Sequence, residues 1–183
     1  MDEKIVVDYS KISEEVRKTD PVIQSGGQVQ DQLMLKLADE IKRLADKVDF
    51  YDTSGRKVKL KVYQQLTPYR ETEEDDDVFP YCVIKFDSSR MLEPGGREEV
   101  KLVLGFGIWV ENKDRQYQHT FFNLYNRITR RFIGNNFLDN FRCEPEMSLA
   151  LSPTDEETYP AYYAAIGMTW MIPGVDREVD FYS

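Results

Sequence analysis

The strongest structural constraint in this chain is the alternation of "VKLVLGFGIWVE", residues 100–111. Successive side chains of a β-strand point to opposite faces of a sheet, so this period of two predicts a long strand with one buried face. The buried face would hold Val100, Leu102, Leu104, Phe106, Ile108 and Val110. The opposite face carries Gly105 and Gly107, which indicates a bulge or a close backbone approach.

Two segments instead repeat their apolar residues with the spacing of an α-helix. The first follows Asp31, a plausible N-cap, and its apolar positions are Met34, Leu37, Ala38, Ile41, Leu44, Ala45 and Val48. The second follows Asn112 or Asp114 as a cap, and its positions are Tyr117, Phe121, Leu124, Tyr125, Ile128 and Phe132. Both segments are predicted to be amphipathic helices.

Shorter alternating or β-branched runs predict the remaining strands. Residues 57–62 alternate lysines with apolar side chains, "YCVIKFD" follows Pro80, and a short strand is expected at 146–151. Residues 88–98 form a long connection with a Pro-Gly-Gly turn signal, so the strands before and after it form a long-looped hairpin.

The last predicted strand lies in "TYPAYYAAIGMTWMIPGVDRE", residues 158–178, between Pro160 and Pro173. Neither proline can donate to a sheet ladder, so both suit strand boundaries. One face would hold Tyr162, Ala164, Ile166, Met168, Trp170 and Ile172, and the other Tyr159, Ala161, Tyr163, Ala165, Gly167, Thr169 and Met171. Both faces are mostly apolar, which fits a central strand or a strand covered by another subunit.

Strands joined by turns favour an α+β class with a mainly antiparallel sheet of about four to five strands. The two amphipathic helices would pack on one face of that sheet. Residues 1–27 end in "SGG" at 25–27, a flexible joint by composition, so they are interpreted as an N-terminal arm. Residues 28–183 then form a single α+β domain.

Composition restricts the class of protein further. The net charge is −9 and the isoelectric point is about 4.8, which disfavours a main role in gripping nucleic acid. No apolar run reaches the roughly 20 residues of a membrane span, so no membrane partner is expected. The first residues lack the pattern of a secretion signal, which predicts a cytoplasmic protein. Residues 71–77 hold six acids in seven positions and are expected to be a solvated loop.

Residues able to perform catalysis are few. His119 is the single histidine and is expected on a helix surface, while Cys82 and Cys143 are expected to be buried and unbridged. No phosphate loop, zinc motif or dinucleotide fingerprint occurs, so no cofactor or metal is predicted. Arg127, Arg130 and Arg131 suit the negative end of a helix dipole, with DNA or an acidic neighbour as the alternative.

One catalytic pattern remains as an alternative. Asp87 at a strand end, followed by Glu99 and Lys101 on the next strand, resembles the layout of restriction-like nucleases. There, carboxylates hold magnesium and a lysine helps to activate water. The competing interpretation is a charge pair on a strand edge, and the protein is predicted not to be an enzyme.

Three segments together resemble the tail terminator proteins of long-tailed bacteriophages and prophages. They are "VFPYCVIKF", "KLVLGFGIWVENKDRQYQHTFFNLYNRITRRF" and "YPAYYAAIGMTWMIPGVDRE", which lie within roughly residues 78–178. The resemblance implies an α+β subunit without catalytic residues that forms a ring, usually a hexamer, on the finished tail tube. The ring would stop tube polymerisation and offer a surface to the head connector, with DNA passing through its pore.

This resemblance sets the expected partners and location: further copies of the chain, the tube protein and the head-tail connector, in the host cytoplasm during assembly and then at the head-proximal end of the tail. Another head-tail joining protein, a stopper or completion protein, is the neighbouring alternative. Candidate subunit or partner contacts are Arg90, Met91, Leu92 and Arg97 in the 88–98 connection, and Tyr162 and Tyr163 in the last strand.

Overall fold

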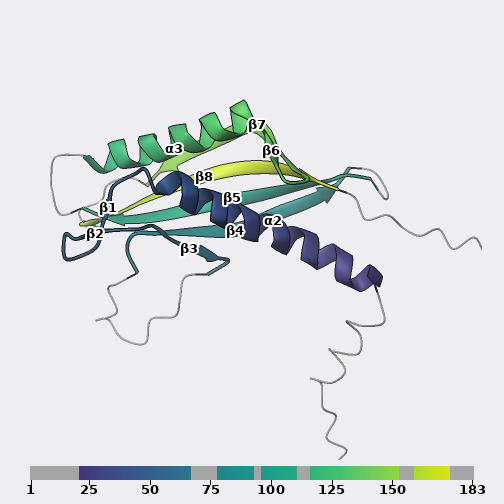
Figure 1. Cartoon of the computed structure of the whole chain (residues 1–183), viewed down its shortest axis with the longest axis horizontal. Coiled ribbons are helices and arrows are strands. Elements are labelled where there is room, and N and C mark those ends of the chain that lie inside the picture. The colour runs from purple at the N-terminus through teal and green to yellow at the C-terminus, as the bar shows by residue number, and fades with distance from the viewer. Residues whose placement is uncertain (1–20, 67–77, 93–95, 111–115, 153–158, 174–183) are drawn as a thin grey trace, which may run out of the picture.

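The computed structural model describes residues 21–66, 78–92, 96–110, 116–152 and 159–173 (Figure 1). Two of its elements are long helices, and the others are strands that alternate with short turns. In chain order the elements are α2 (Pro21–Ala45), β1 (Phe50–Tyr51), β2 (Lys57–Val58), β3 (Lys61–Gln64), β4 (Tyr81–Met91), β5 (Glu98–Trp109), α3 (Gln116–Gly134), β6 (Phe137–Leu138), β7 (Phe141–Leu151) and β8 (Ala161–Ile172).

Six strands form one sheet in the order β3-β4-β5-β8-β7-β6. β3 and β4 pair in parallel, whereas the other neighbours in this sheet pair antiparallel. β1 and β2 form a separate antiparallel hairpin. The predicted α+β class with a mainly antiparallel sheet is confirmed, and the sheet has six strands because β3 and β6 extend its edges.

Both helices lie on the same face of the large sheet (Figure 1). α2 packs on β3 and on α3, and α3 packs on β7 and β8. The predicted helical stripes are the buried ones, because each places its apolar residues toward the sheet. The core between the layers includes Leu37, Ile41, Leu102, Leu104, Phe106, Phe121, Leu124, Ile128, Phe132, Ile166 and Trp170, all at most 2% exposed.

The first helix begins earlier than the sequence predicts. α2 starts at Pro21 and contains residues 25–27, so neither the flexible joint at "SGG" nor the cap at Asp31 is correct. Glycine costs a helix about 1 kcal/mol. The turn that follows the glycines is anchored, because Val29 packs on the core and the Gln30 side chain donates to Glu98 Oε1 at 2.9 Å. The first 20 residues of the predicted arm at 1–27 lie outside the described residues.

The predicted boundaries of one strand and of one loop are also wrong. Residues 57–62 do not form one strand: β2 pairs with β1, the chain changes sheets at the buried Leu60, and β3 then pairs with β4. Residues 88–91 are not part of a loop, because β4 continues through them and pairs with Glu98–Lys101 after a bulge at Asp87. This end of the hairpin is polar and exposed, so it lacks the apolar alternation that marks a strand.

The β1–β2 hairpin is held by one buried carboxylate. Asp52, 3% exposed, accepts hydrogen bonds from Ser54 Oγ at 2.7 Å and from the Ser54 and Arg56 amides at 2.9 Å, and it pairs with the Arg56 guanidinium. These hydrogen bonds, that of Ser54 Oγ first, lower the pKa of Asp52 from 3.8 to about 2. The ionised side chain therefore stabilises the turn.

Replacing this carboxylate is expected to lower the stability of the protein in a pH-dependent way. Because the folded-state pKa is lowered, the contribution of Asp52 is fully present above pH 3.8 and is lost as the pH falls toward 2. Asp52→Asn is therefore expected to lower the urea midpoint at neutral pH, and the difference from wild type should shrink below pH 4. A difference that stays constant from pH 7 to pH 2 would contradict this role.

Candidate functional site

The face of the sheet opposite the helices is the main candidate site. Within the described residues no helix or second sheet covers it, and we call it the open face. Register assigns to it Tyr81, Val83, Lys85, Lys101, Val103, Gly105, Gly107, Ser148, Ala150, Tyr163, Ala165, Gly167 and Thr169. Its centre carries small side chains, because Gly105 and Ala150 both flank Ala165. A strip of small side chains allows close approach by a partner.

One end of the open face is aromatic. The ring of Phe79 lies 5.4 Å from that of Tyr81, 5.7 Å from Trp109 and 6.3 Å from Tyr163. Tyr163 is 36% exposed, whereas Phe79 is buried. Beside this cluster a hollow of about 280 Å³ is lined by Leu66, Tyr81, Lys85 and Tyr163, among others. The aromatic end therefore offers rings and a shallow depression on one surface.

Gly107 makes room for this cluster. A Cβ at Gly107 would lie 2.4 Å from the Tyr81 ring, so the tyrosine packs across the bare backbone. Of the two glycines, only Gly107 marks a close approach, and it is the approach of a side chain rather than of the predicted backbone. The bulge of this hairpin lies in β4 instead.

A pair of glycine substitutions tests this packing. Gly107→Ala is expected to destabilise the protein by about 1–3 kcal/mol, because Tyr81 must move out of the aromatic cluster. Gly105→Ala is the matched control, since its Cβ would meet its nearest atom, the Val83 carbonyl oxygen, at 3.9 Å. Urea unfolding of both variants measures the difference, and equal stability of the two variants would show that Tyr81 does not require the glycine.

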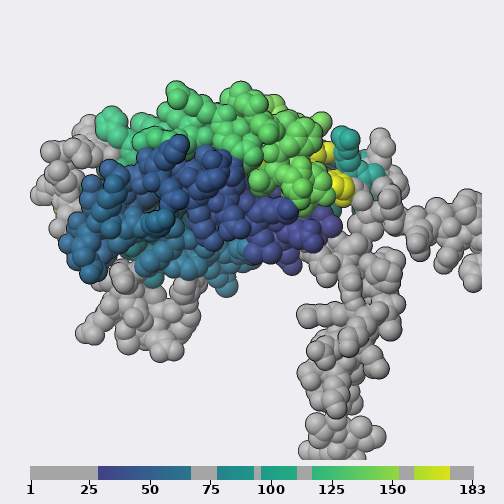
Figure 2. Space-filling view, viewed as in Figure 1, coloured from purple at the N-terminus to yellow at the C-terminus, as the bar shows by residue number. Residues whose placement is uncertain are grey.

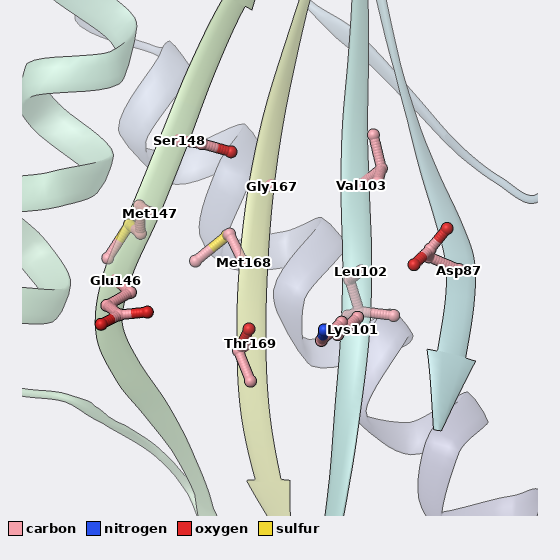
Figure 3. Close-up of a pocket in the computed structure, with 10 residues that line it drawn as sticks. All are labelled: Asp87, Lys101, Leu102, Val103, Glu146, Met147, Ser148, Gly167, Met168 and Thr169. Atoms are coloured by element: carbon pink, nitrogen blue, oxygen red, sulfur yellow. The ribbon is translucent and has the colours of Figure 1, made fainter. Parts of the chain in front are cut away.

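The other end of the open face is polar. A hollow of about 320 Å³ is lined by Asp87, Lys101, Glu146, Ser148 and Thr169, among others. These side chains come from the neighbouring strands β4, β5, β8 and β7, and Figure 3 shows a helix behind the strands. The hollow is open and of mixed charge.

The nuclease alternative can be compared with this geometry. Asp87 and Lys101 line the same hollow, whereas Glu99 Oε2 pairs with Arg90 Nη2 at 3.5 Å. Asp87 accepts a hydrogen bond from Ser88 Oγ at 3.1 Å. Among the residues that the structure describes, no group of three His, Cys, Asp or Glu is placed to hold a metal ion.

The predicted contact residues fall into two separate places. Arg90 and Met91 end β4, and the Leu92 amide donates to the Arg97 carbonyl at 3.2 Å across the hairpin end. Met91 and Leu92 are about half exposed. Tyr162 and Tyr163 lie at the opposite end of the sheet, ten residues further along the β5–β8 ladder, or about 30 Å away.

The two tyrosines also face opposite sides. Tyr162 stacks on Tyr117 of α3, with ring centroids 3.9 Å apart, and is therefore part of the helix side. Tyr163 belongs to the open face. Phe79, Tyr81 and Trp109 are not among the contact residues predicted from the sequence, although Trp109 shares the strand face of Gly105 and Gly107.

The remaining sequence predictions concern single residues. His119 is exposed on α3, and Cys82 and Cys143 are free and buried, as predicted. Burial raises the pKa of both thiols, that of Cys143 to about 12. The caps at Asn112 and Asp114 and the acidic loop at 71–77 lie outside the described residues. No helix in the described ranges has the length and apolarity to span a membrane.

Comparison with known proteins adds no family assignment: neither the protein-family models nor the curated proteins include a match to this chain.

Proposed function

We propose that this chain is a tail terminator of a long-tailed bacteriophage or prophage: a non-enzymatic subunit whose ring caps the tail tube and presents a surface to the head connector. The proposal combines the sequence resemblance with one structural observation. That observation is the open face, a broad sheet surface with small residues at its centre and aromatic residues at one end.

The open face supports assembly because it differs from the helix side of the molecule. A ring forms by head-to-tail contacts, in which one patch of a subunit meets a different patch of the next. The open face supplies one patch, and the helix layer on the other side of the sheet supplies a chemically different one. Exposed apolar side chains on both sides would be covered by such contacts.

The proposed partners follow from this role. They are further copies of the chain, most simply six, then the tube protein and the head-tail connector. DNA would pass through the pore, and the net charge of −9 would keep its phosphates from binding tightly. The protein would assemble in the host cytoplasm and remain in the virion at the head-proximal end of the tail.

The solution mass of the full chain tests ring formation. Light scattering coupled to size-exclusion chromatography, from micromolar to near-millimolar concentration, is expected to show a species heavier than one subunit. Its mass should approach a whole-number closed oligomer at the highest concentrations. A strict monomer across the whole range would count against the proposal.

A further inference from the structure

A second surface lies between the two helices, on the side opposite the open face. A hollow of about 460 Å³ is lined by Leu44 of α2 and by Asn123, Asn126, Arg127, Arg130 and Arg131 of α3, and we call it the arginine groove. Figure 2 shows α3 in green beside α2, which runs from purple to blue, and the groove lies along the boundary between the two helices. Its lining contains three guanidinium groups and no carboxylate.

The charge of this surface is opposite to that of the chain. α3 contains no Asp or Glu from Gln116 to Gly134, although the whole protein has a net charge of −9. Glu40 of α2 accepts hydrogen bonds from Arg43 and from Arg131 of the groove. Those bonds, that of Arg43 first, lower the pKa of Glu40, so it stays ionised and neutralised by its own partners.

Two arginines of the groove remain without a matching charge. Arg127 Nε donates to Asn123 Oδ1 at 3.0 Å, a neutral acceptor. Among the described residues neither Arg127 nor Arg130 forms an ion pair. Arg130 is exposed, and its side chain projects from the groove side of α3. The groove therefore has the capacity to pair with added negative charge.

Apolar residues beside the groove indicate a protein partner. Phe122 and Ile133 of α3 are 44% and 68% exposed, and helical spacing places Ile133 next to Arg130 and Phe122 next to Asn126 of the groove. Arginine with exposed aromatic and aliphatic side chains is typical of protein interfaces. A nucleic-acid site would instead need a wider basic surface than this acidic chain provides.

We infer that the arginine groove binds the acidic segment 71–77 of a neighbouring copy of this chain. The segment supplies six carboxylates in seven residues, and Tyr69 precedes them by two positions, so its sequence matches both the arginines and the exposed Phe122. This inference rests on the proposed ring and names one of its subunit contacts.

The position of the segment in the fold favours a contact between copies. The described residues on either side of it are Leu66, two residues after the edge strand β3, and Val78, just before β4, whereas α3 lies over β7 and β8 near the other edge of the sheet. Four strand spacings separate β3 from β7, roughly 19 Å. α2 contacts both β3 and α3 and so lies between the two surfaces. Donor and acceptor are thus different patches of one subunit, as head-to-tail assembly requires.

Charge exchange in the full-length protein tests the contact. The groove variant is Arg127→Glu/Arg130→Glu, the segment variant is Glu73→Lys/Glu74→Lys, and the exchange variant carries all four changes and regains the wild-type net charge. Sedimentation velocity at fixed salt measures self-association. Each pair alone is expected to raise the apparent dissociation constant about tenfold or more, because like charges then face each other. The exchange variant should recover most of the wild-type association.

Two controls match the changes in net charge. Lys42→Glu/Lys47→Glu alters exposed lysines outside the groove, and Glu156→Lys/Glu157→Lys alters the second acidic run of the chain. Both controls should associate like wild type in the same experiment. Far-ultraviolet circular dichroism spectra equal to wild type confirm that each variant is folded, which is expected because neither Arg127 nor Arg130 forms an ion pair among the described residues.

The outcomes separate this contact from the ring itself. If the groove variant forms the same oligomer as wild type, with the same concentration dependence, the proposed contact is wrong. The proposed function is not affected by that result. Loss of association in the groove variant but not in the segment variant also overturns the contact, because the groove then contacts a different part of the neighbouring copy. A wild type that is monomeric and does not cap tubes overturns the inference together with the proposed function.

Discussion

Trp170→Ala is expected to remove about 3–5 kcal/mol of unfolding free energy, the largest loss for any single residue of this core. Trp170 is fully buried, and the ring of Phe132 meets it edge-on with centroids 5.1 Å apart. It lies in β8 between Val100 of β5 and Cys143 of β7, so its removal leaves a cavity where α3 meets three strands. Urea unfolding followed by circular dichroism measures the loss.

Two further variants separate this effect from a general loss of tryptophan. Trp170 Nε1 forms no hydrogen bond within the described residues, so Trp170→Phe is expected to cost less than half as much: it keeps an aromatic ring and removes a buried unpaired donor. Trp109→Phe leaves Trp170 as the single indole, and acrylamide should quench its fluorescence weakly. Strong quenching, or equal losses for Trp170→Ala and Trp170→Phe, would show that this side of the strand is not a packed core.

Ala165→Glu is expected to weaken self-association by more than about 100-fold, because a neighbour that covers the open face would bury an unpaired carboxylate at a cost of several kcal/mol. Within one subunit Ala165 lies between Gly105 and Ala150, and no described layer covers it. The folded subunit itself should therefore lose about 0.5 kcal/mol or less. Sedimentation velocity measures the association, and urea unfolding measures the stability.

Tyr51→Glu is the matched control for this change. It also introduces a Glu, at a position of the β1–β2 hairpin that is 48% exposed and belongs neither to the open face nor to the helices. Its association should equal that of wild type. If Ala165→Glu associates as tightly as the control, the open face is not a subunit contact.

The sequence predicts the layers of this fold well where one face of an element is buried. The spacing of Tyr117, Phe121, Leu124 and Phe132 defines α3, and the alternation around Leu104 defines β5, because these side chains meet a single core. The pairing of β5 with β8, far apart in the chain, cannot be read from either segment alone. The pairing depends on the tertiary packing of the sheet against the two helices.

Segments that do not pack against the two helices were predicted less well. Ser88, Ser89 and Arg90 continue β4 beyond the core, so no buried side marks them as strand. The doubly apolar β8 did indicate that its second face needed explanation, and that face is part of the open face. The arginines of α3 were visible in the sequence, whereas Leu44, which closes the groove from α2, becomes a neighbour only through helix packing.

The growth of tail tubes tests the central proposal most directly. The tube protein from the same genome is polymerised with and without the full chain, and tube lengths and ends are measured by electron microscopy. The wild-type chain, added at fewer copies than the tube protein, should stop elongation and leave a ring on one end of each tube. The Ala165→Glu variant should leave elongation unchanged. Tubes that elongate equally with and without the wild-type chain, and that carry no ring, would contradict the account.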